Sequence, residues 1–355
     1  MKSIFERGQL LPPGAARLPV LSASILASLC LCLATEKASA CACGCGAFDI
    51  GANAAFPNSS DSGLSAWFRY NFMNQNKNWE GSSSAPAADN LDKDIKTSFF
   101  TFGGQYMINR DWGVMVELPV FKRSFTSTGD GTAYPAGSIF TSDLTDLGDV
   151  MVQGVYAGFS PDMSTGVTFG VKLPTGNYTG PALGPGQSAN GQFDLIYDRD
   201  TLPGSGSTDL LFGAYHVGGL TQDNKLAYFT QARYQFAVME RAGATGTYRP
   251  GNELDLGAGL TYSLGAMGSF KNVAPVLQLI ASDRSSDGGT GSSFNSGYRR
   301  LMIAPGIDLR IDKFKIYADV SLPLVQNVNT DIPSSGNVGQ LTASTIWRLQ
   351  IGYDF

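Results

Sequence analysis

The segment that decides the fold is STIWRLQIGYDF, residues 344–355, at the C-terminus of the chain. Every second position from Trp347 onward carries an apolar or aromatic side chain: Trp347, Leu349, Ile351, Tyr353 and Phe355. Polar residues fill most of the positions between them. A period of two is the period of a β-strand, so this segment predicts a strand with one apolar and one polar face.

The same alternation recurs along most of the chain. It is clearest at residues 64–72, 112–120 and 166–173, where apolar residues share one face and polar or small residues share the other. Similar patterns predict further strands near 96–108, 147–159, 207–217, 225–237, 253–263, 273–282, 299–310, 314–323 and 340–355. The sequence therefore predicts an all-β protein of about twelve strands, each about ten residues long.

The connections between these strands alternate in length. Long ones fall at 73–94, 122–146, 174–206, 238–252, 283–298 and 324–339; shorter ones fall at 109–111, 160–163, 218–224, 264–272 and 311–313. Outer-membrane barrels have an even number of antiparallel strands, short periplasmic turns and long external loops. The alternation favours a closed transmembrane β-barrel. The alternative is a soluble sandwich or jelly roll, which has no reason to sort its loops this way.

In such a barrel the apolar face meets lipid and the polar face lines the lumen. Aromatic residues near strand ends are then expected in the interfacial girdles: Trp112, Tyr156, Tyr234, Tyr262 and Tyr353. The last strand resembles the closing strand that the bacterial barrel-assembly machinery recognises. We expect the assembly signal to lie in Trp347, Tyr353 and Phe355.

The N-terminal region has the features of a secretory signal. A basic start with Lys2, Arg7 and Arg17 precedes an apolar core at 18–34, and Ala38-Ser39-Ala40 has the small-x-small form of a cleavage site. We expect residues 1–40 to be a signal peptide, 41–63 a periplasmic segment and 64–355 the barrel. The expected location is the outer membrane of a Gram-negative bacterium.

Three cysteines, Cys41, Cys43 and Cys45, follow the predicted cleavage site directly. Three hypotheses remain open for them. A disulfide between Cys41 and Cys45 suits an oxidising periplasm. A lipid on Cys41 would anchor the N-terminus. Thiolate ligation would select a soft ion such as Cu(I) or Zn.

Charged residues of both signs fall on the predicted lumen face. The solute path is predicted to include Arg69, Glu117, Lys172, Arg233, Asp255, Asp319 and Arg348, and further inward charges are expected at Lys96, Asp308, Arg310 and Asp354. A strongly ion-selective pore carries one dominant sign at its constriction. The mixed signs fit either an open, weakly selective channel or a salt-bridged, nearly closed lumen.

No catalytic centre is expected. His216 is the only histidine, so any Ser-His-Asp mechanism would depend on it, and it lies at the predicted periplasmic end of a strand. The net charge of −5 argues against a nucleic-acid partner. The expected partners are outer-membrane lipid, the barrel-assembly machinery and a small solute.

Five motifs, taken in order, resemble the outer-membrane "transporter" family linked to the MetA pathway of phenol degradation. They are DLGDVMVQGVYAGF (146–159), VKLPTGNY (171–178), LPGSGSTDLLFGAYH (202–216), YRPGNELDLGAGLTY (248–262) and SLPLVQNVNT (321–330). The resemblance implies a channel for passive passage of small solutes, with hydrophobic or aromatic compounds expected. Two alternatives stay open: a Cu- or Zn-binding outer-membrane protein that uses the three cysteines, and a structural barrel without a pore.

Overall fold

The computed structural model describes residues 63–129, 135–179, 183–188, 191–196, 202–243, 246–290, 296–330 and 339–355. All of them belong to one compact unit of the chain. The predicted signal peptide and Cys41, Cys43 and Cys45 lie outside the described residues. Among the described residues, no helix is long and apolar enough to cross a membrane.

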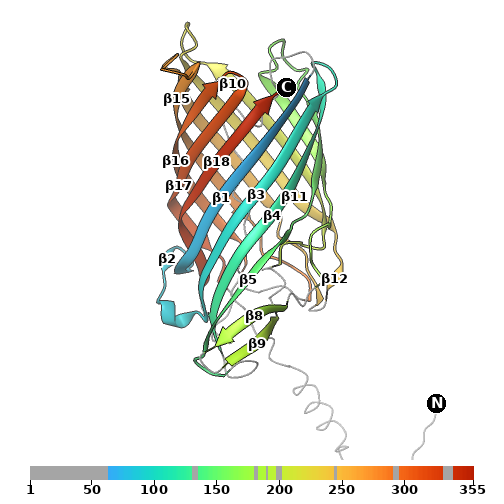
Figure 1. Cartoon of the computed structure of the whole chain (residues 1–355), viewed down its shortest axis with the longest axis vertical. Coiled ribbons are helices and arrows are strands. Elements are labelled where there is room, and N and C mark those ends of the chain that lie inside the picture. Colours follow the sequence, from blue (N-terminus) through green and yellow to red (C-terminus); the bar gives the residue numbers. More distant parts are fainter. Residues whose placement is uncertain are drawn as a thin grey trace, which may run out of the picture. The chain divides into compact units, whose positions relative to one another are not determined.

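Twelve strands form a closed antiparallel barrel, which confirms the predicted fold class (Figure 1). In wall order they are β1 (Gly63–Glu80), β3 (Asp92–Met107), β4 (Trp112–Thr128), β6 (Met151–Tyr156), β7 (Thr165–Lys172), β10 (Thr208–Gly219), β11 (Leu226–Met239), β14 (Glu253–Tyr262), β15 (Asn272–Arg284), β16 (Tyr298–Ile311), β17 (Phe314–Val328) and β18 (Gln340–Asp354).

Among the described residues, six further strands and one turn lie outside the ring of twelve, and two of these strands form a sheet of their own. They are β2 (Ser83–Ser84), β5 (Ile139–Leu147), β8 (Leu183–Ser188), β9 (Gly191–Ile196), the pair β12 (Ala242–Gly243) and β13 (Gly246–Thr247), and one 3-10 turn at Ala87–Asp89. Strand β5 continues the pairing of β4 beyond β6.

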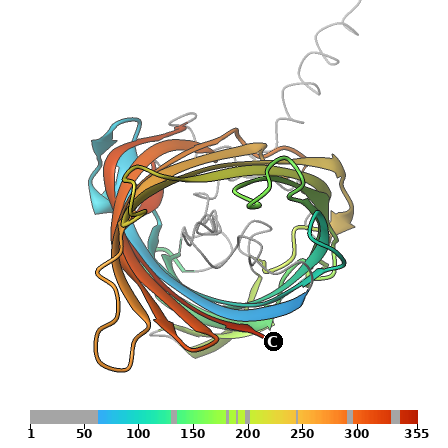
Figure 2. The same cartoon turned by 90° about the horizontal axis from the view of Figure 1, so that it is seen from above.

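The first and last strands close the barrel. Strand β1 pairs with β3 on one side and with β18 on the other, so Phe68 lies opposite both Phe102 and Ile351. Seen from above, the strands form a complete ring (Figure 2). Closure pairs the first and last strands along the apolar belt, and a barrel needs this because lipid cannot hydrogen-bond an exposed backbone.

The two ends of the barrel differ. We call the end with the short connections, the start of β1 and the end of β18 the turn end, and the opposite end the loop end (Figure 1). The short turns fall at 108–111, 157–164, 220–225, 263–271 and 312–313. The predicted alternation of loop lengths is therefore confirmed. In one turn, hydrogen bonds from Ser164 lower the pKa of Asp162 to about 2.

The predicted strand length was wrong for several strands. Strand β1 has 18 residues, β3 has 16 and β4 has 17. The additional residues, such as 73–80 of β1, are mostly polar and were assigned to loops from the sequence. They pair as strand beyond the apolar belt, where the outer face no longer has to be apolar.

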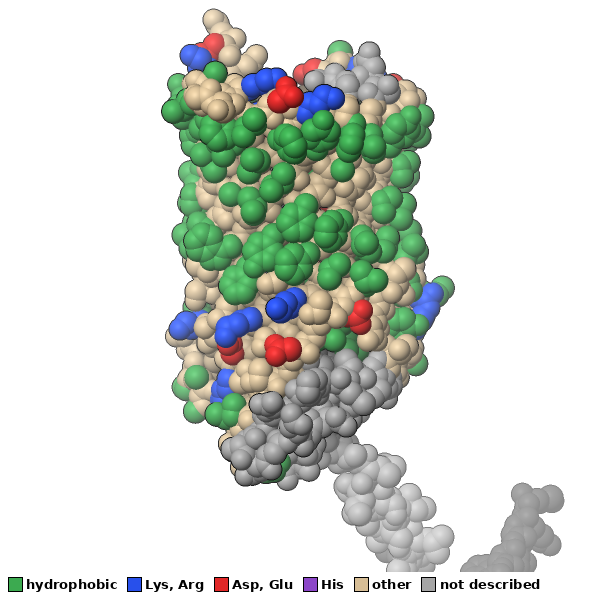
Figure 3. All heavy atoms as spheres, viewed as in Figure 1, with side chains coloured by type: hydrophobic (Ala, Val, Ile, Leu, Met, Phe, Trp, Pro, Cys, Tyr) green, Lys and Arg blue, Asp and Glu red, His purple; other side chains and the backbone are tan. Residues whose placement is uncertain are grey.

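The outer surface carries a continuous apolar belt. On β4, Val114, Val116 and Leu118 are exposed, whereas Met115 and Glu117 between them are buried. Figure 3 shows hydrophobic side chains across the visible face of the barrel, with charged side chains above and below them. A belt of this kind is the lipid-facing surface of a membrane barrel.

Aromatic side chains mark the belt's borders. At the turn end the rings of Trp112 and Tyr156 lie 4.6 Å apart, and Tyr353 packs edge-on against Phe355 at 4.9 Å. Tyr234 packs against Phe236 at 5.5 Å, nearer the loop end. Trp347, Tyr353 and Phe355 all lie on the outer face of the last strand or just beyond it. Their role as an assembly signal stays a prediction.

The apolar belt predicts that an arginine on the outer face of β4 lowers the free energy of unfolding by an amount that depends on its position along the strand. Val116→Arg places a guanidinium within the belt and should lower the free energy of unfolding by about 2–4 kcal/mol, whereas Ser124→Arg, on the same face beyond the belt, should cost about 0–1 kcal/mol. Urea unfolding in lipid vesicles measures both. Equal costs for the two variants would show that residue 116 does not face lipid.

Candidate functional site

The candidate site is the inner face of the barrel, where the structure places all seven residues of the predicted solute path. Six of them are at most 9 % exposed, and Arg233 is half-buried. Each cation among them contacts at least one carboxylate. The structure therefore brings the predicted residues together as ion pairs, and their role in solute passage stays a prediction.

The first pair joins β1 to β4. Arg69 Nη2 lies 2.9 Å from Glu117 Oε1, and its Nη1 donates to Gln350 Oε1 on β18 at 3.3 Å. Strand β3 lies between the two charged residues, and Gly103 is the β3 partner of Glu117. A Cβ at Gly103 would lie 2.0 Å from the Trp67 ring, so only glycine leaves room for this indole on the inner wall.

Asp319 is the centre of the second network. Its Oδ2 accepts hydrogen bonds from Arg348 Nη1 at 3.0 Å, from the Tyr317 hydroxyl at 2.6 Å and from Gln278 Nε2 at 3.0 Å. The side chains of Arg348 and Asp319 are 2 % and 0 % exposed. Such a buried pair holds its charges only because further hydrogen bonds replace water around the carboxylate.

The third pair reaches the lumen. Arg233 Nη2 lies 3.1 Å from Asp255 Oδ2, and Ser282 donates to the other carboxylate oxygen at 2.7 Å. The Arg233 side chain is 21 % exposed, while Asp255 beneath it is fully buried. Of the four cations in the predicted path, Arg233 is the most accessible.

The fourth network lies at the loop-end side of the two shortest wall strands, β6 and β7, and fixes the chain segments next to them. Lys172 Nζ lies 2.8 Å from Asp209 and donates to Ser205 Oγ at 2.6 Å. Asp149 accepts from the backbone nitrogens of Ser205 at 2.8 Å and Gly176 at 3.0 Å. Strands β6 and β7 have only 6 and 8 residues. Asp149 therefore ties together the segments that continue the wall beyond them.

An apolar band crosses the same inner face. Phe99, Phe229, Met73, Met302, Val276, Ile280 and Ile346 form its main cluster, with Phe121 packed against it. The rings of Phe99 and Phe121 meet edge-on at 5.0 Å. The sequence analysis assigned polar side chains to the lumen face and missed this band. Adjacent apolar residues such as Phe99 and Phe100 were the available signal, because one of the two must point inward.

Four further residues were expected to point inward. Asp308 is buried and Arg310 is partly exposed, with 3.6 Å between their charged atoms. Asp354 pairs with Lys315 at 3.0 Å near the turn end. The assignment of Lys96 was wrong: it lies on the outer face, where it is half exposed and pairs with Asp94 at 2.7 Å. Its neighbours Ile95 and Thr97 take the inner positions.

His216 lies on the outer face near the turn end. Its Nδ1 lies 2.8 Å from Thr165 Oγ1 and its Nε2 lies 2.9 Å from the Tyr228 hydroxyl. Both ring nitrogens are therefore engaged by hydroxyl groups of neighbouring strands, an arrangement that stabilises the wall. Within the described ranges, no group of three or more His, Cys, Asp or Glu residues could hold a metal ion. The cysteine hypotheses concern residues outside those ranges and stay predictions.

Comparison with known proteins supports the architecture. No protein-family model matches the chain, and no curated protein matches it. The COG4313 outer membrane channel from Pseudomonas putida F1 is similar in structure, with a TM-score of 0.58 and 12 % identity, over 87 % of this chain and all of that one. This similarity shows the fold of an outer-membrane β-barrel. The resemblance to the phenol-degradation family stays a prediction.

Weaker similarities extend to other barrels. The β domain of the Bordetella autotransporter BrkA has a TM-score of 0.45 at 12 % identity and covers 82 % of this chain and all of that one. A Pseudomonas aeruginosa FadL homologue has a TM-score of 0.41 at 10 % identity, over 83 % of this chain and 91 % of that one.

The Lys172 network predicts a large loss of stability when its cation is removed. Lys172→Met leaves Asp149 and Asp209 buried without their cation and should lower the free energy of unfolding by about 3–5 kcal/mol. Lys225→Met breaks an exposed pair with Asp223 and should cost less than about 1 kcal/mol. Urea midpoints of the two variants in the same vesicles make the comparison. A Lys172→Met midpoint equal to that of Lys225→Met would contradict the assigned role.

Proposed function

We propose that the protein is an outer-membrane channel through which small solutes pass down their gradients. The observation that carries this proposal is the composition of the inner wall, where locally neutral ion pairs alternate with an apolar band. A wall that only had to close the barrel would need no buried charges. No step of chemical catalysis is proposed.

The paired charges favour weak ion selectivity. Every cation of the predicted path lies within 4 Å of a carboxylate, so none of these four positions presents an uncompensated positive charge to the lumen. Strong selectivity in channels comes from rings of like charge at a constriction. Passage through this lumen is therefore expected to depend on size and polarity more than on charge.

The apolar band favours solutes with a hydrophobic or aromatic body. The main cluster contains phenylalanine and methionine, whose faces and thioethers are groups against which a ring packs. These side chains are at most 4 % exposed, so a ring reaches them only where the inner wall opens. The resemblance to a family linked to phenol degradation points in the same direction. The polar groups beside the band would hold the hydroxyl or carboxyl group of such a solute.

The orientation follows from the general rule for these barrels. Short turns face the periplasm and long loops face the exterior, so the turn end is assigned to the periplasm. Both the start of β1 and the end of β18 then lie on the periplasmic side. We assign outer-membrane lipid to the belt, and recognition by the barrel-assembly machinery to Trp347, Tyr353 and Phe355.

The channel proposal makes a prediction about one accessible charge. Arg233→Gln leaves the carboxylate of Asp255 without its cation beside the lumen, so the channel should become more cation-selective. The reversal potential in planar bilayers under a salt gradient measures this change. Arg299→Gln is the matched control, because Arg299 is 79 % exposed on the outer face and pairs with Asp283. Reversal potentials equal to the wild-type value in both variants would place Arg233 off the conducting path.

A further inference from the structure

The barrel wall has a seam along which two neighbouring strands, β17 and β18, separate. Strands β17 and β18 pair from Phe314↔Tyr353 as far as Ser321↔Ile346, and no farther. Beyond this point β17 still pairs with β16 as far as Val328, and β18 still pairs with β1 as far as Gln340. Residues Leu322–Asn327 and Leu341–Thr345 therefore face each other across the seam without a backbone ladder.

The sequence explains why pairing stops here. Pro323 has no N–H to donate, and proline in a sheet is confined to edges and bulges. A register shift follows at once, because Pro323 lies opposite Met302 while Val325 lies opposite Leu301. Strand β18 is irregular over the same stretch, with two register shifts against β1 between Met73 and Lys77. Bulges of this kind bend a strand away from its neighbour.

The seam is closed at the loop end of the barrel. Val328 N donates to Gly81 O at 2.9 Å, so β17 meets the end of β1 directly. The indole Nε1 of Trp79 donates to the backbone oxygen of Gln326 at 3.3 Å. The result is a slit bounded by paired backbone at both ends and covered in part by one aromatic side chain.

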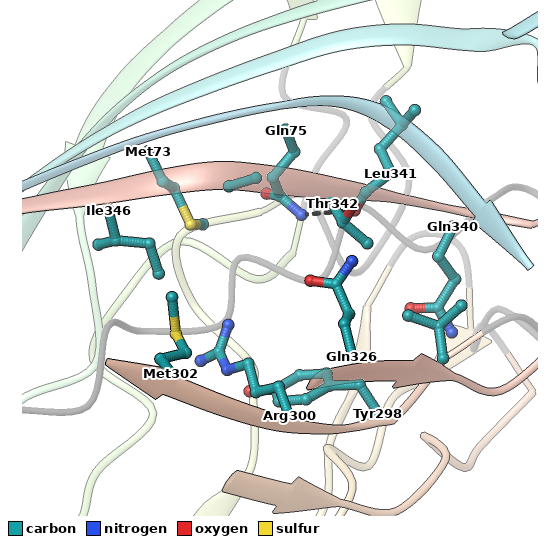
Figure 4. Close-up of a pocket in the computed structure, with 12 residues that line it drawn as sticks. Met73, Gln75, Tyr298, Arg300, Met302, Gln326, Gln340, Leu341, Thr342 and Ile346 are labelled. Carbon is teal, nitrogen blue, oxygen red and sulfur yellow. Dashed lines mark hydrogen bonds between the residues drawn. The ribbon is translucent and has the colours of Figure 1, made fainter. Parts of the chain in front are cut away.

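A narrow cavity lies on the inner side of this slit (Figure 4). Side chains of β1, β16, β17 and β18 point into it, among them Met73, Met302 and Ile346 of the apolar band. Gln75 Nε2 donates to Leu341 O at 3.0 Å. Gln75 is 6 % exposed, and its Oε1 accepts no hydrogen bond from the described residues. A buried acceptor left without a donor is destabilising, and a ligand hydroxyl that donates to it would remove this cost.

The outer side of the slit is apolar on one edge. Leu322, Leu324 and Val325 of β17 are 38 %, 54 % and 59 % exposed. Next to them an outer groove of about 480 Å³ is lined by Leu254, Leu256 and Leu301. Arg300 borders both this groove and the inner cavity. Apolar surface thus lies on both sides of the wall at a place where two neighbouring wall strands are not paired.

We propose that this seam binds a small solute with an apolar body and one hydroxyl group, and passes it between the lumen and the outer leaflet. The body would lie against Met73 and Met302, and the hydroxyl would donate to Gln75 Oε1. The cavity is about 40 Å³, well below the roughly 150 Å³ that accommodates benzene, so the strands must part for a ring to enter. Parting them here breaks no ladder hydrogen bonds. The inference rests on the proposed channel function and gives it a route and a solute class.

The binding step is tested with 1-naphthol and naphthalene in detergent solution, by ligand fluorescence. Gln75→Leu should weaken 1-naphthol binding about tenfold, the effect of one lost hydrogen bond, and leave naphthalene binding unchanged. Gln153→Leu, at a buried inner position of β6, is the control and should change neither. Equal loss of both ligands in Gln75→Leu, or no loss of 1-naphthol, would overturn the assigned hydrogen bond.

The opening step is tested by hydrogen exchange and by cross-linking. Among residues 322–327 and 341–345, the amides that point into the seam should exchange at least tenfold faster than the amides of 314–321, whereas the amides paired with β16 or β1 should stay protected. In a background with Cys41, Cys43 and Cys45 replaced by Ser, a short bis-methanethiosulfonate linker across Leu324→Cys and Ser344→Cys, which forms a disulfide with each thiol and releases methanesulfinate, should abolish 1-naphthol binding while conductance remains. Ala258→Cys with Leu279→Cys, directly paired on β14 and β15 and lining neither cavity, is the control and should leave binding unchanged.

These measurements separate the seam from the channel. Uniform protection of both segments, or full 1-naphthol binding with the seam cross-linked, would overturn the lateral route even in a conducting protein. Loss of binding only in the seam variant, together with fast exchange there, would support the route. An absence of conductance in the wild-type protein would count against the proposed channel, while exchange and binding would still decide whether the seam opens.

Discussion

The structure depends on one constraint: within a bilayer, a backbone N–H or C=O group must find its partner inside the protein. The pairing of β1 with β18, from Ser65↔Asp354 to Trp79↔Gln340, meets this constraint because it closes the wall. Once the ring is closed, the alternation of side chains along each strand decides which residues face lipid and which face the interior. One set of side chains must be compatible with lipid, and the other set is free to build an interior.

The inward-facing side chains form two kinds of contact. Ion pairs such as Arg348–Asp319 hold neighbouring strands together and keep the wall locally neutral. Apolar side chains such as Phe229 and Met302 cover the stretches between them. Gly259 lets this band run past β14, since a Cβ there would lie 2.2 Å from the Phe229 ring. The combination provides contacts for both ends of an amphipathic solute, which is the basis of the proposed function.

Much of this fold was predictable because it depends on a period of two. Val114, Val116 and Leu118 reveal the outer face of β4 from sequence alone, and the loop lengths reveal which connections share an end. The register between neighbouring strands, in contrast, could not be predicted from the sequence pattern. Arg69 meets Glu117 and Gln350 only because β1 lies between β3 and β18 with particular offsets, and no local pattern encodes those offsets. Lys96 was placed on the wrong face because the adjacent Phe99 and Phe100 make the phase of that strand ambiguous.

The most direct measurement of the central claim is osmotic swelling of vesicles that contain the purified protein. If the closed barrel conducts small solutes, vesicles transferred to an isosmotic solution of arabinose should swell faster than protein-free vesicles, because the sugar enters through the lumen and water follows. The rate should fall as the sugar is replaced by larger oligosaccharides. Swelling no faster than in protein-free vesicles, for the smallest solute tested, would contradict the account.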